Sequence, residues 1–212
     1  MAKSKSISST MVDMTDGGGN SKIPWDKSHP AQQAPSTLKE ALGTKGRPMG
    51  MERALSGANP YYSGNYREYS ENCQRAVVAY ELRRRGYDVI AQPTFENDVL
   101  PSMGRWQGAF QGARRESIGA STTAKARDNL RNKMQSYGPG SRAIVGVNWK
   151  SGGGHVFNVE NVGGRIHYID AQTGVRYNPK TILNGTKSGS VSILRTDNLR
   201  ISDRAKKSVR PR

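Results

Sequence analysis

The sequence predicts an α+β fold, in which a helix near the middle of the chain packs on an antiparallel sheet. Apolar side chains recur at helical spacing over residues 72–85, and Gly86 follows directly, as glycine does after many helices. Further along, short apolar segments alternate with glycine-rich turns, a pattern typical of antiparallel strands. The segments expected to form strands are residues 87–91, 142–149, 154–162, 165–170 and 191–194.

The helix over residues 72–85 has signals at both of its ends. Asn72 is expected to be the N-cap, because an asparagine side chain can accept a hydrogen bond from an early backbone N–H. Cys73 opens the apolar stripe, which should face the core. The three arginines at positions 83–85 lie in the last turn, where positive charge suits the helix dipole.

A second helix of about 14 residues is expected to begin at Thr122 or Thr123. Its apolar residues recur every four positions, which indicates a stripe that faces the core. They are Ala126, Leu130 and Met134.

Composition divides the chain into three parts. Residues 1–58 are rich in Ser, Gly, Pro, Lys and Gln and show no sustained periodicity, so we expect a flexible or partner-docking arm. Residues 59–195 contain the predicted helices and strands and are expected to form one folded domain. Residues 196–212 are expected to be a basic tail.

The chain of 212 residues is strongly basic, with 33 Lys and Arg against 17 Asp and Glu and a formal net charge of +16. Such a charge favours contact with nucleic acid, anionic surfaces or acidic proteins, and says nothing about the fold. Contact with nucleic acid through the basic tails is therefore one expectation for partners.

Several classes of protein are excluded or disfavoured. The single cysteine rules out a disulfide within the chain and a cysteine-cluster metal site, and neither a metal nor a cofactor is expected. No run of about 18 apolar residues is present, so no membrane span is expected. The first residues lack the apolar segment of a secretory signal, and the protein is expected to be cytoplasmic as made.

Cys73 is the only cysteine, and it lies where the predicted helix begins. The partial positive charge at a helix N-terminus favours the thiolate, which is the nucleophilic form. A free cysteine is nevertheless more often an inert, buried side chain. A nucleophilic role therefore requires a nearby base and a group that orients it.

Two histidine–carboxylate pairs lie on the predicted hairpin. If Gly163 and Gly164 form a two-residue turn, Asp170 becomes the diagonal neighbour of His155, about 7–8 Å away on the same face. A carboxylate there can hold the imidazole in one tautomer and stabilise its protonated form. His167 pairs directly with Glu160 on the opposite face, so geometry alone does not choose between the two pairs.

The apolar residues around each pair favour His155 as the candidate base. The His155 face is the more apolar one, which suits a face packed against the helix that begins at Cys73. The face of His167 is more polar, and we interpret His167–Glu160 as a surface cross-strand pair. Apolar neighbours on the His155 face are Phe157, Val159, Ile166 and Tyr168.

The segments NCQRAVVAYELRRRGYDV, GGHVFNVENV and IHYIDAQTG resemble the three blocks of the papain-fold toxin domains of bacterial polymorphic toxins. Those domains are classed as protein glutamine deamidases, and similar domains accompany phage head proteins. The resemblance covers about residues 59–195. It implies a papain-like fold in which Cys73 is the nucleophile, His155 the base and Asp170 the orienting acid.

The donor that would stabilise an oxyanion departs from the related pattern. Papain-like proteases have a glutamine six residues before the nucleophile, and here that position is Arg67. The backbone N–H of Cys73 is the first candidate for this role. The side chains of Asn72 and Gln172 are further candidates.

The leading hypothesis is a cysteine hydrolase that deamidates a glutamine side chain of a target protein through a thioester. A cysteine protease or a transglutaminase would use the same three residues. A basic phage or virion structural protein, or a nucleic-acid-associated protein with an inactive papain-like fold, is the alternative. Expected partners are the target protein, an immunity protein, and a phage or delivery particle that would make the protein virion-associated or carry it into a target cell.

Overall fold

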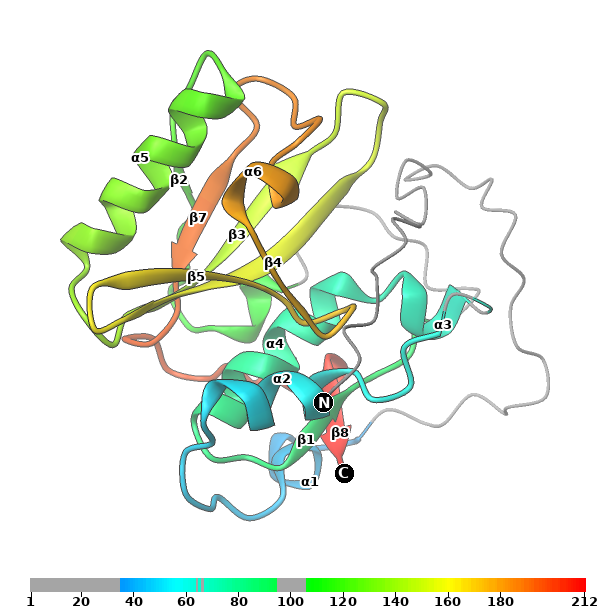
Figure 1. The fold of residues 1–212 in the computed structure, drawn as a ribbon. Coiled ribbons are helices and arrows are strands. Elements are labelled where there is room, and N and C mark those ends of the chain that lie inside the picture. Colours follow the sequence, from blue (N-terminus) through cyan, green and yellow to red (C-terminus); the bar gives the residue numbers. More distant parts are fainter. Residues whose placement is uncertain (1–34, 64, 66, 95–105) are drawn as a thin grey trace, which may run out of the picture.

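The computed structural model describes residues 35–63, 65, 67–94 and 106–212. The helices are α1 (Leu38–Leu42), α2 (Met51–Ala58), α3 (Arg67–Ser70), α4 (Cys73–Arg84), α5 (Thr123–Ser136) and α6 (Pro179–Ile182), with short 3-10 helices η1 (Gln107–Ala109) and η2 (Asp203–Lys207). The strands are β1 (Val89–Ala91), β2 (Glu116–Ser117), β3 (Arg142–Asn148), β4 (Gly154–Val162), β5 (Arg165–Asp170), β6 (Val175–Tyr177), β7 (Ser192–Arg195) and β8 (Val209–Pro211). Figure 1 shows how these elements are arranged.

The main sheet has six strands in the order β2-β7-β3-β4-β5-β6, and every neighbouring pair is antiparallel. Val162 pairs with Arg165, so the predicted two-residue turn between β4 and β5 is confirmed. Its residues, Gly163 and Gly164, have φ angles of 59° and 90°. Glycine adopts such positive φ angles without the strain that a side chain would cause.

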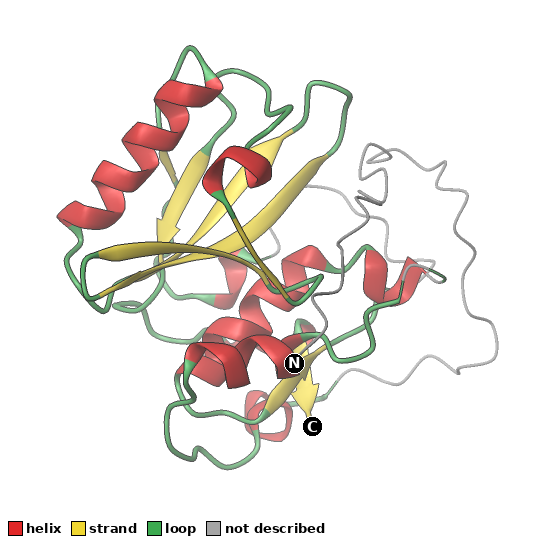
Figure 2. Ribbon diagram, viewed as in Figure 1, coloured by secondary structure: helices red, strands yellow, loops and turns green. Residues whose placement is uncertain are grey.

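Helices cover both faces of the main sheet, as Figure 2 shows with helices in red and strands in yellow. The apolar residues of α4 share one core with Ile144, Val156 and Ile169. Those of α5 share a second core with Val145 and Phe157, which point the opposite way from the same strands. The predicted class, α+β with a helix packed on an antiparallel sheet, is confirmed.

The N-terminal boundary expected at residue 58 is wrong for the residues that the structure describes. Helices α1 and α2 lie within the expected arm, yet Ala41, Leu42, Ala54 and Leu55 are buried in the core around α4. The helices have five and eight residues, too few to show a sustained period. Helices this short gain their stability from packing rather than from propensity. The remainder of the expected arm, residues 1–34, lies outside the described residues.

The C-terminal segment is also folded, contrary to the expectation of a basic tail. Strand β8 pairs with β1 to form a separate two-stranded sheet, with Arg210 opposite Ile90. Ala205 and Val209 are completely buried in the core around α4. In the sequence, these two apolar residues stand among many basic ones, so the composition suggested an exposed tail.

Within the described ranges, none of the helices is both long and apolar enough to cross a membrane.

Candidate functional site

Cys73 is the first residue of α4, as the sequence predicts. The carbonyl oxygen of Asn72 accepts the backbone N–H groups of Arg75 and Ala76, at 2.8 and 3.0 Å. The expected side-chain cap is wrong, because the Asn72 carboxamide makes no capping bond and instead exchanges hydrogen bonds with Asn59. The helix therefore begins at the predicted residue, but its first turn is not capped in the predicted way.

His155 and Asp170 are in direct contact. His155 is the second residue of β4, and its Nε2 lies 3.2 Å from Oδ2 of Asp170, the last residue of β5. The other carboxylate oxygen, Oδ1, accepts the backbone N–H groups of Gln172 and Thr173, at 3.0 and 3.4 Å. Both side chains of the pair are buried. Asp170 is thus held on both oxygens, with one of them directed at the imidazole.

Aromatic rings fix the plane of the His155 imidazole. Trp149 and Phe157 each stack against it, with centroids 6.4 Å away and interplanar angles of 18° and 28°. Sequence analysis assigned no role to Trp149. Its place next to the loop before β4, close along the chain to His155, was the only signal for it.

Cys73 lies close enough to the same imidazole to influence its protonation. Since Asp170 contacts Nε2, Nδ1 is the ring nitrogen left for the thiol. Burial by itself lowers the pKa of His155, but the charge and hydrogen bond of Asp170, followed by those of Cys73, raise this pKa to about 10. The structure thus brings together Cys73, His155 and Asp170, with an imidazole that is protonated at neutral pH.

His155 was favoured over His167 because its face was expected to pack against α4. That expectation is wrong, although the structure does bring His155 close to Cys73. The face of the sheet with His155 packs against α5, whereas α4 covers the opposite face. Glu160 on that opposite face is 1% exposed and binds Tyr80 and Arg84 of α4. The sequence suggested solvent there because polar residues alternate along the strand, but α4 supplies partners that allow them to be buried.

His155 therefore meets Cys73 at the end of the sheet rather than across a covered face. It lies at the start of β4, and Cys73 lies at the start of α4. His167 does pair with Glu160 across the strands, as expected, but Glu160 is buried, so the pair is not a surface feature.

Three buried side-chain carboxamides lie close along the chain or in hydrogen-bond contact with the segments of Cys73 and Asp170, and we call them the amide cluster. Asn59 donates from Nδ2 to the carbonyl oxygen of Gln172 at 2.8 Å. Gln172 donates from Nε2 to the carbonyl oxygen of Ser70 at 2.6 Å, and Asn72 donates to that of Gln92 at 3.3 Å. The members are Asn59, Asn72 and Gln172, which are 7%, 1% and 3% exposed.

The side-chain candidates for an oxyanion donor are already engaged. Gln172 and Asn72 donate within the amide cluster, and Arg67 forms an ion pair with Glu71 at 2.9 Å. Among the described residues, the Cys73 backbone N–H donates to no backbone carbonyl. The backbone group is therefore the donor that remains available at the start of α4.

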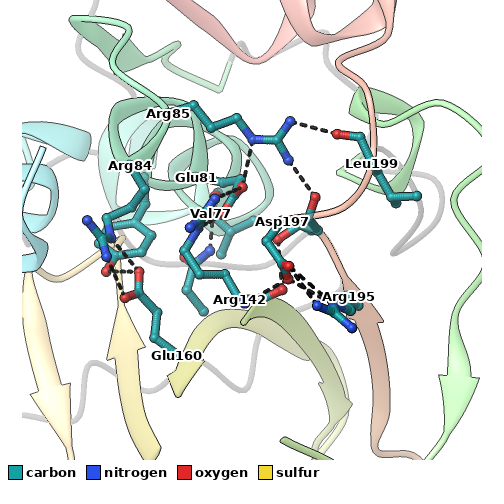
Figure 3. Close-up of polar contacts among 12 residues, drawn as sticks. Val77, Glu81, Arg84, Arg85, Arg142, Glu160, Arg195, Asp197 and Leu199 are labelled. Atoms are coloured by element: carbon teal, nitrogen blue, oxygen red, sulfur yellow. Dashed lines mark hydrogen bonds and ion pairs between the residues drawn. The ribbon is translucent and has the colours of Figure 1, made fainter. Parts of the chain in front are cut away.

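The C-terminal half of α4 is docked on the sheet by charged side chains (Figure 3). Glu81 binds Arg85 of the same turn and Arg142 of β3, at 2.7 and 2.9 Å. Arg84 lies 2.7 Å from Glu160 of β4. Glu81 and Glu160 are almost completely buried, so these ion pairs join the helix to two central strands.

Residues 71–175 match the model of the family described as Papain fold toxin 1, glutamine deamidase. The matched segment contains Cys73, His155 and Asp170, and it excludes Asn59 and the C-terminal strand. No curated protein and no solved structure matches the chain. The match supports the papain-fold toxin domain expected from the three sequence segments, in a family described as glutamine deamidases.

Proposed function

We propose that this protein, of which residues 71–175 match the papain fold toxin 1, glutamine deamidase family, deamidates a glutamine side chain of a target protein, with Cys73 as nucleophile. The observation that supports this most directly is the position of His155, whose Nε2 lies 3.2 Å from Asp170 and whose ring is close to Cys73. A thiol, an imidazole and a carboxylate in this order form the constellation used for acyl transfer.

In the first half of the reaction, Cys73 and His155 act as a thiolate–imidazolium pair. The thiolate attacks the side-chain carbonyl carbon of the substrate glutamine and forms a tetrahedral intermediate. The imidazolium gives its proton to the leaving nitrogen, ammonia departs, and a thioester remains on Cys73. Asp170 stabilises the positive imidazolium before the transfer and keeps the ring oriented after it.

In the second half, water resolves the thioester. The neutral His155 takes a proton from water as the oxygen attacks the thioester carbon. Collapse of the second tetrahedral intermediate expels the thiolate of Cys73 and leaves glutamate on the target. The backbone N–H of Cys73 donates a hydrogen bond to the oxyanion in both intermediates, because the neighbouring side-chain amides already bind other groups.

The reactivity of Cys73 can be tested without knowledge of the target protein. Cys73 is the only cysteine, so alkylation by iodoacetamide reports on it alone. At about pH 6 an ordinary thiol is less than about 1% thiolate, whereas a thiolate–imidazolium pair remains reactive. We expect fast alkylation of the parent protein at this pH and at least about a tenfold loss in His155→Ala, since the partner cation is gone. Equal, slow rates in both proteins would remove Cys73 from the mechanism.

Substrate chemistry is tested with ammonia release and mass spectrometry on candidate target proteins. We expect conversion of glutamine to glutamate by the parent and none by Cys73→Ser. Cleavage of the target backbone would identify a protease instead. Incorporation of an added primary amine in place of water would identify a transglutaminase.

A further inference from the structure

Asn59 connects the segments that carry Cys73 and Asp170, two of the three proposed catalytic residues. It follows α2 directly and is 7% exposed. Its side chain exchanges two hydrogen bonds with Asn72, at 2.9 and 3.1 Å, and Asn72 directly precedes Cys73. The same Nδ2 lies 2.9 Å from the carbonyl oxygen of Tyr69, in the helix just before α4. Asn59 therefore binds both the start of the nucleophile helix and the segment that leads into it.

The same side chain also reaches the strand end that bears the acid. Asn59 Nδ2 lies 2.8 Å from the carbonyl oxygen of Gln172, two residues after Asp170. The backbone N–H of Gln172 in turn binds the Asp170 carboxylate at 3.0 Å. A short path of hydrogen bonds thus runs from the residue before Cys73, through Asn59, to the carboxylate that holds His155.

The rest of the amide cluster supports this bridge without replacing it. The side chain of Gln172 binds Ser70, and the side chain of Asn72 binds the carbonyl oxygen of Gln92 as well as Asn59. Of the three side chains, only that of Asn59 comes from outside the two segments and contacts both the start of α4 and the segment after β5. Hydrogen bonds between buried amides are directional, and a lost partner leaves the remaining groups unsatisfied.

We infer that Asn59, which lies outside the family-matched segment, is a positioning residue that holds the start of α4 against the end of β5 and thereby keeps the Cys73 thiol next to the His155 ring. This inference rests on the proposed function, because it concerns the geometry of the same nucleophile and base. Asn59 itself contacts neither of the two reacting groups through a described hydrogen bond, and it acts through Asn72 and Gln172.

The experiment compares alkylation rates of Cys73 at about pH 6 and about pH 9 in the full-length protein. The ratio of the two rates is the readout. The rates are compared under conditions in which circular dichroism shows each variant to be folded, because an unfolded chain would react as an ordinary thiol, mainly at the higher pH. In a folded variant, a displaced Cys73 loses reactivity at the lower pH. Asn59→Ala removes every side-chain bond. Asn59→Asp keeps the shape and the acceptor but removes both amide donors, and it provides a second variant should the first fail to fold.

Asn161→Ala is the matched control. Asn161 is also a buried carboxamide that donates to a backbone carbonyl, that of Met134 at 3.1 Å, and accepts a backbone N–H, that of Gly164 at 2.9 Å. It lies near the opposite end of β4 from His155. We expect the ratio of rates to fall by about tenfold or more in both Asn59 variants and to stay at the parent value in Asn161→Ala.

The outcomes separate this inference from the proposed function. A parent protein without excess reactivity at about pH 6 would contradict the proposed nucleophile itself. A reactive parent together with unchanged ratios in folded Asn59 variants would overturn the positioning role alone. An equal fall in Asn161→Ala would also overturn it, because the effect would then follow from general destabilisation.

Discussion

Helices α4 and α5 pack on opposite faces of one sheet but differ in the charge that is buried beneath them. Helix α5 presents the apolar stripe Ala126, Leu130 and Met134, all buried against the strands. Helix α4 adds polar bonds to its apolar contacts, including ion pairs of Glu81 and Arg84 with β3 and β4.

The difference teaches how this fold holds the proposed nucleophile. Apolar packing is non-directional and tolerates small shifts of a helix along its axis. Hydrogen bonds and ion pairs depend on distance and angle, so they restrict such shifts. Asn158 of β4 adds one more such bond, to the carbonyl oxygen of Val77 at 3.1 Å. Helix α5 also has polar bonds to the sheet, from Asn161 of β4 to the carbonyl oxygen of Met134 and between Lys133 and Glu116 of β2. The carboxylate of Glu116 is half exposed, whereas Glu81 and Glu160, which join α4 to β3 and β4, are buried.

The largest effect is expected from removal of residues 196–212. This segment supplies the carbonyl oxygens of Thr196 and Leu199 to Arg85, and the buried Ala205 and Val209 to the core around α4. The core around α5 contains no residue of this segment. We expect the truncated chain to lose most of the about 5–15 kcal/mol that typically stabilises a domain. Hydrogen exchange should show the loss first in α4, and equal loss in α5 would contradict the comparison.

The next largest effect is expected from Glu81→Gln. The substitution keeps the size of the side chain but leaves Arg85 and Arg142 without their buried counter-charge. We expect the free energy of unfolding to fall by about 3–5 kcal/mol in chemical denaturation. Asp128→Asn, which removes the partner of Arg131 in a half-exposed pair on α5, is the control and should cost nothing measurable.

Leu130→Ala tests the apolar side of the comparison. Leu130 is completely buried under α5, so its truncation leaves a cavity and should lower the free energy of unfolding by about 3 kcal/mol. In the folded fraction, the ratio of Cys73 alkylation rates at low and high pH should nevertheless keep its parent value. A changed ratio would show that the α5 face also positions the nucleophile.

The smallest effect is expected from Asp170→Asn, and it depends on pH. The pKa of His155 is raised to about 10 in the folded protein, against 6.5 for the free side chain. Protonated His155 therefore contributes stability that is complete below about pH 6.5 and is lost as the pH rises toward about 10. Without the carboxylate, burial lowers this pKa and only Cys73 still raises it, so the variant should lose part of this stabilisation near neutral pH.

Urea unfolding at a series of pH values checks the sign of this effect. The difference in the free energy of unfolding between the parent and Asp170→Asn should shrink as the pH rises from about 6.5 toward about 10. His167→Gln, on the opposite face of the same hairpin, is the control and should show no such trend. A difference that stays constant with pH would mean that Asp170 stabilises the fold by another route.

Much of the local structure could be predicted, because its signals lie within short stretches of sequence. The expected helix over residues 72–85 is observed at Cys73–Arg84, and the second helix at Thr123–Ser136. The two glycines between β4 and β5 set the register that brings Asp170 to the side of His155. Each of these features depends on residues that are near one another in the chain.

Features that depend on distant partners could not be predicted. Glu160 was expected in solvent, because nothing nearby in the sequence shows that Tyr80 and Arg84 bind it from 80 and 76 residues away. For the same reason Asn72 and Gln172 looked like free amide donors until Asn59 and Ser70 were found beside them.

The sequence by itself determined the class of fold, the helix that begins at Cys73 and the hairpin that pairs His155 with Asp170. Their signals are local periodicity, turn residues and register, which act over a few residues. Only the tertiary structure decided which face α4 covers, that residues 35–58 and 196–212 belong to the core, and which amides surround the site. The physical reason is that a polar side chain can be buried wherever a distant segment satisfies it, and the chain order does not reveal that partner.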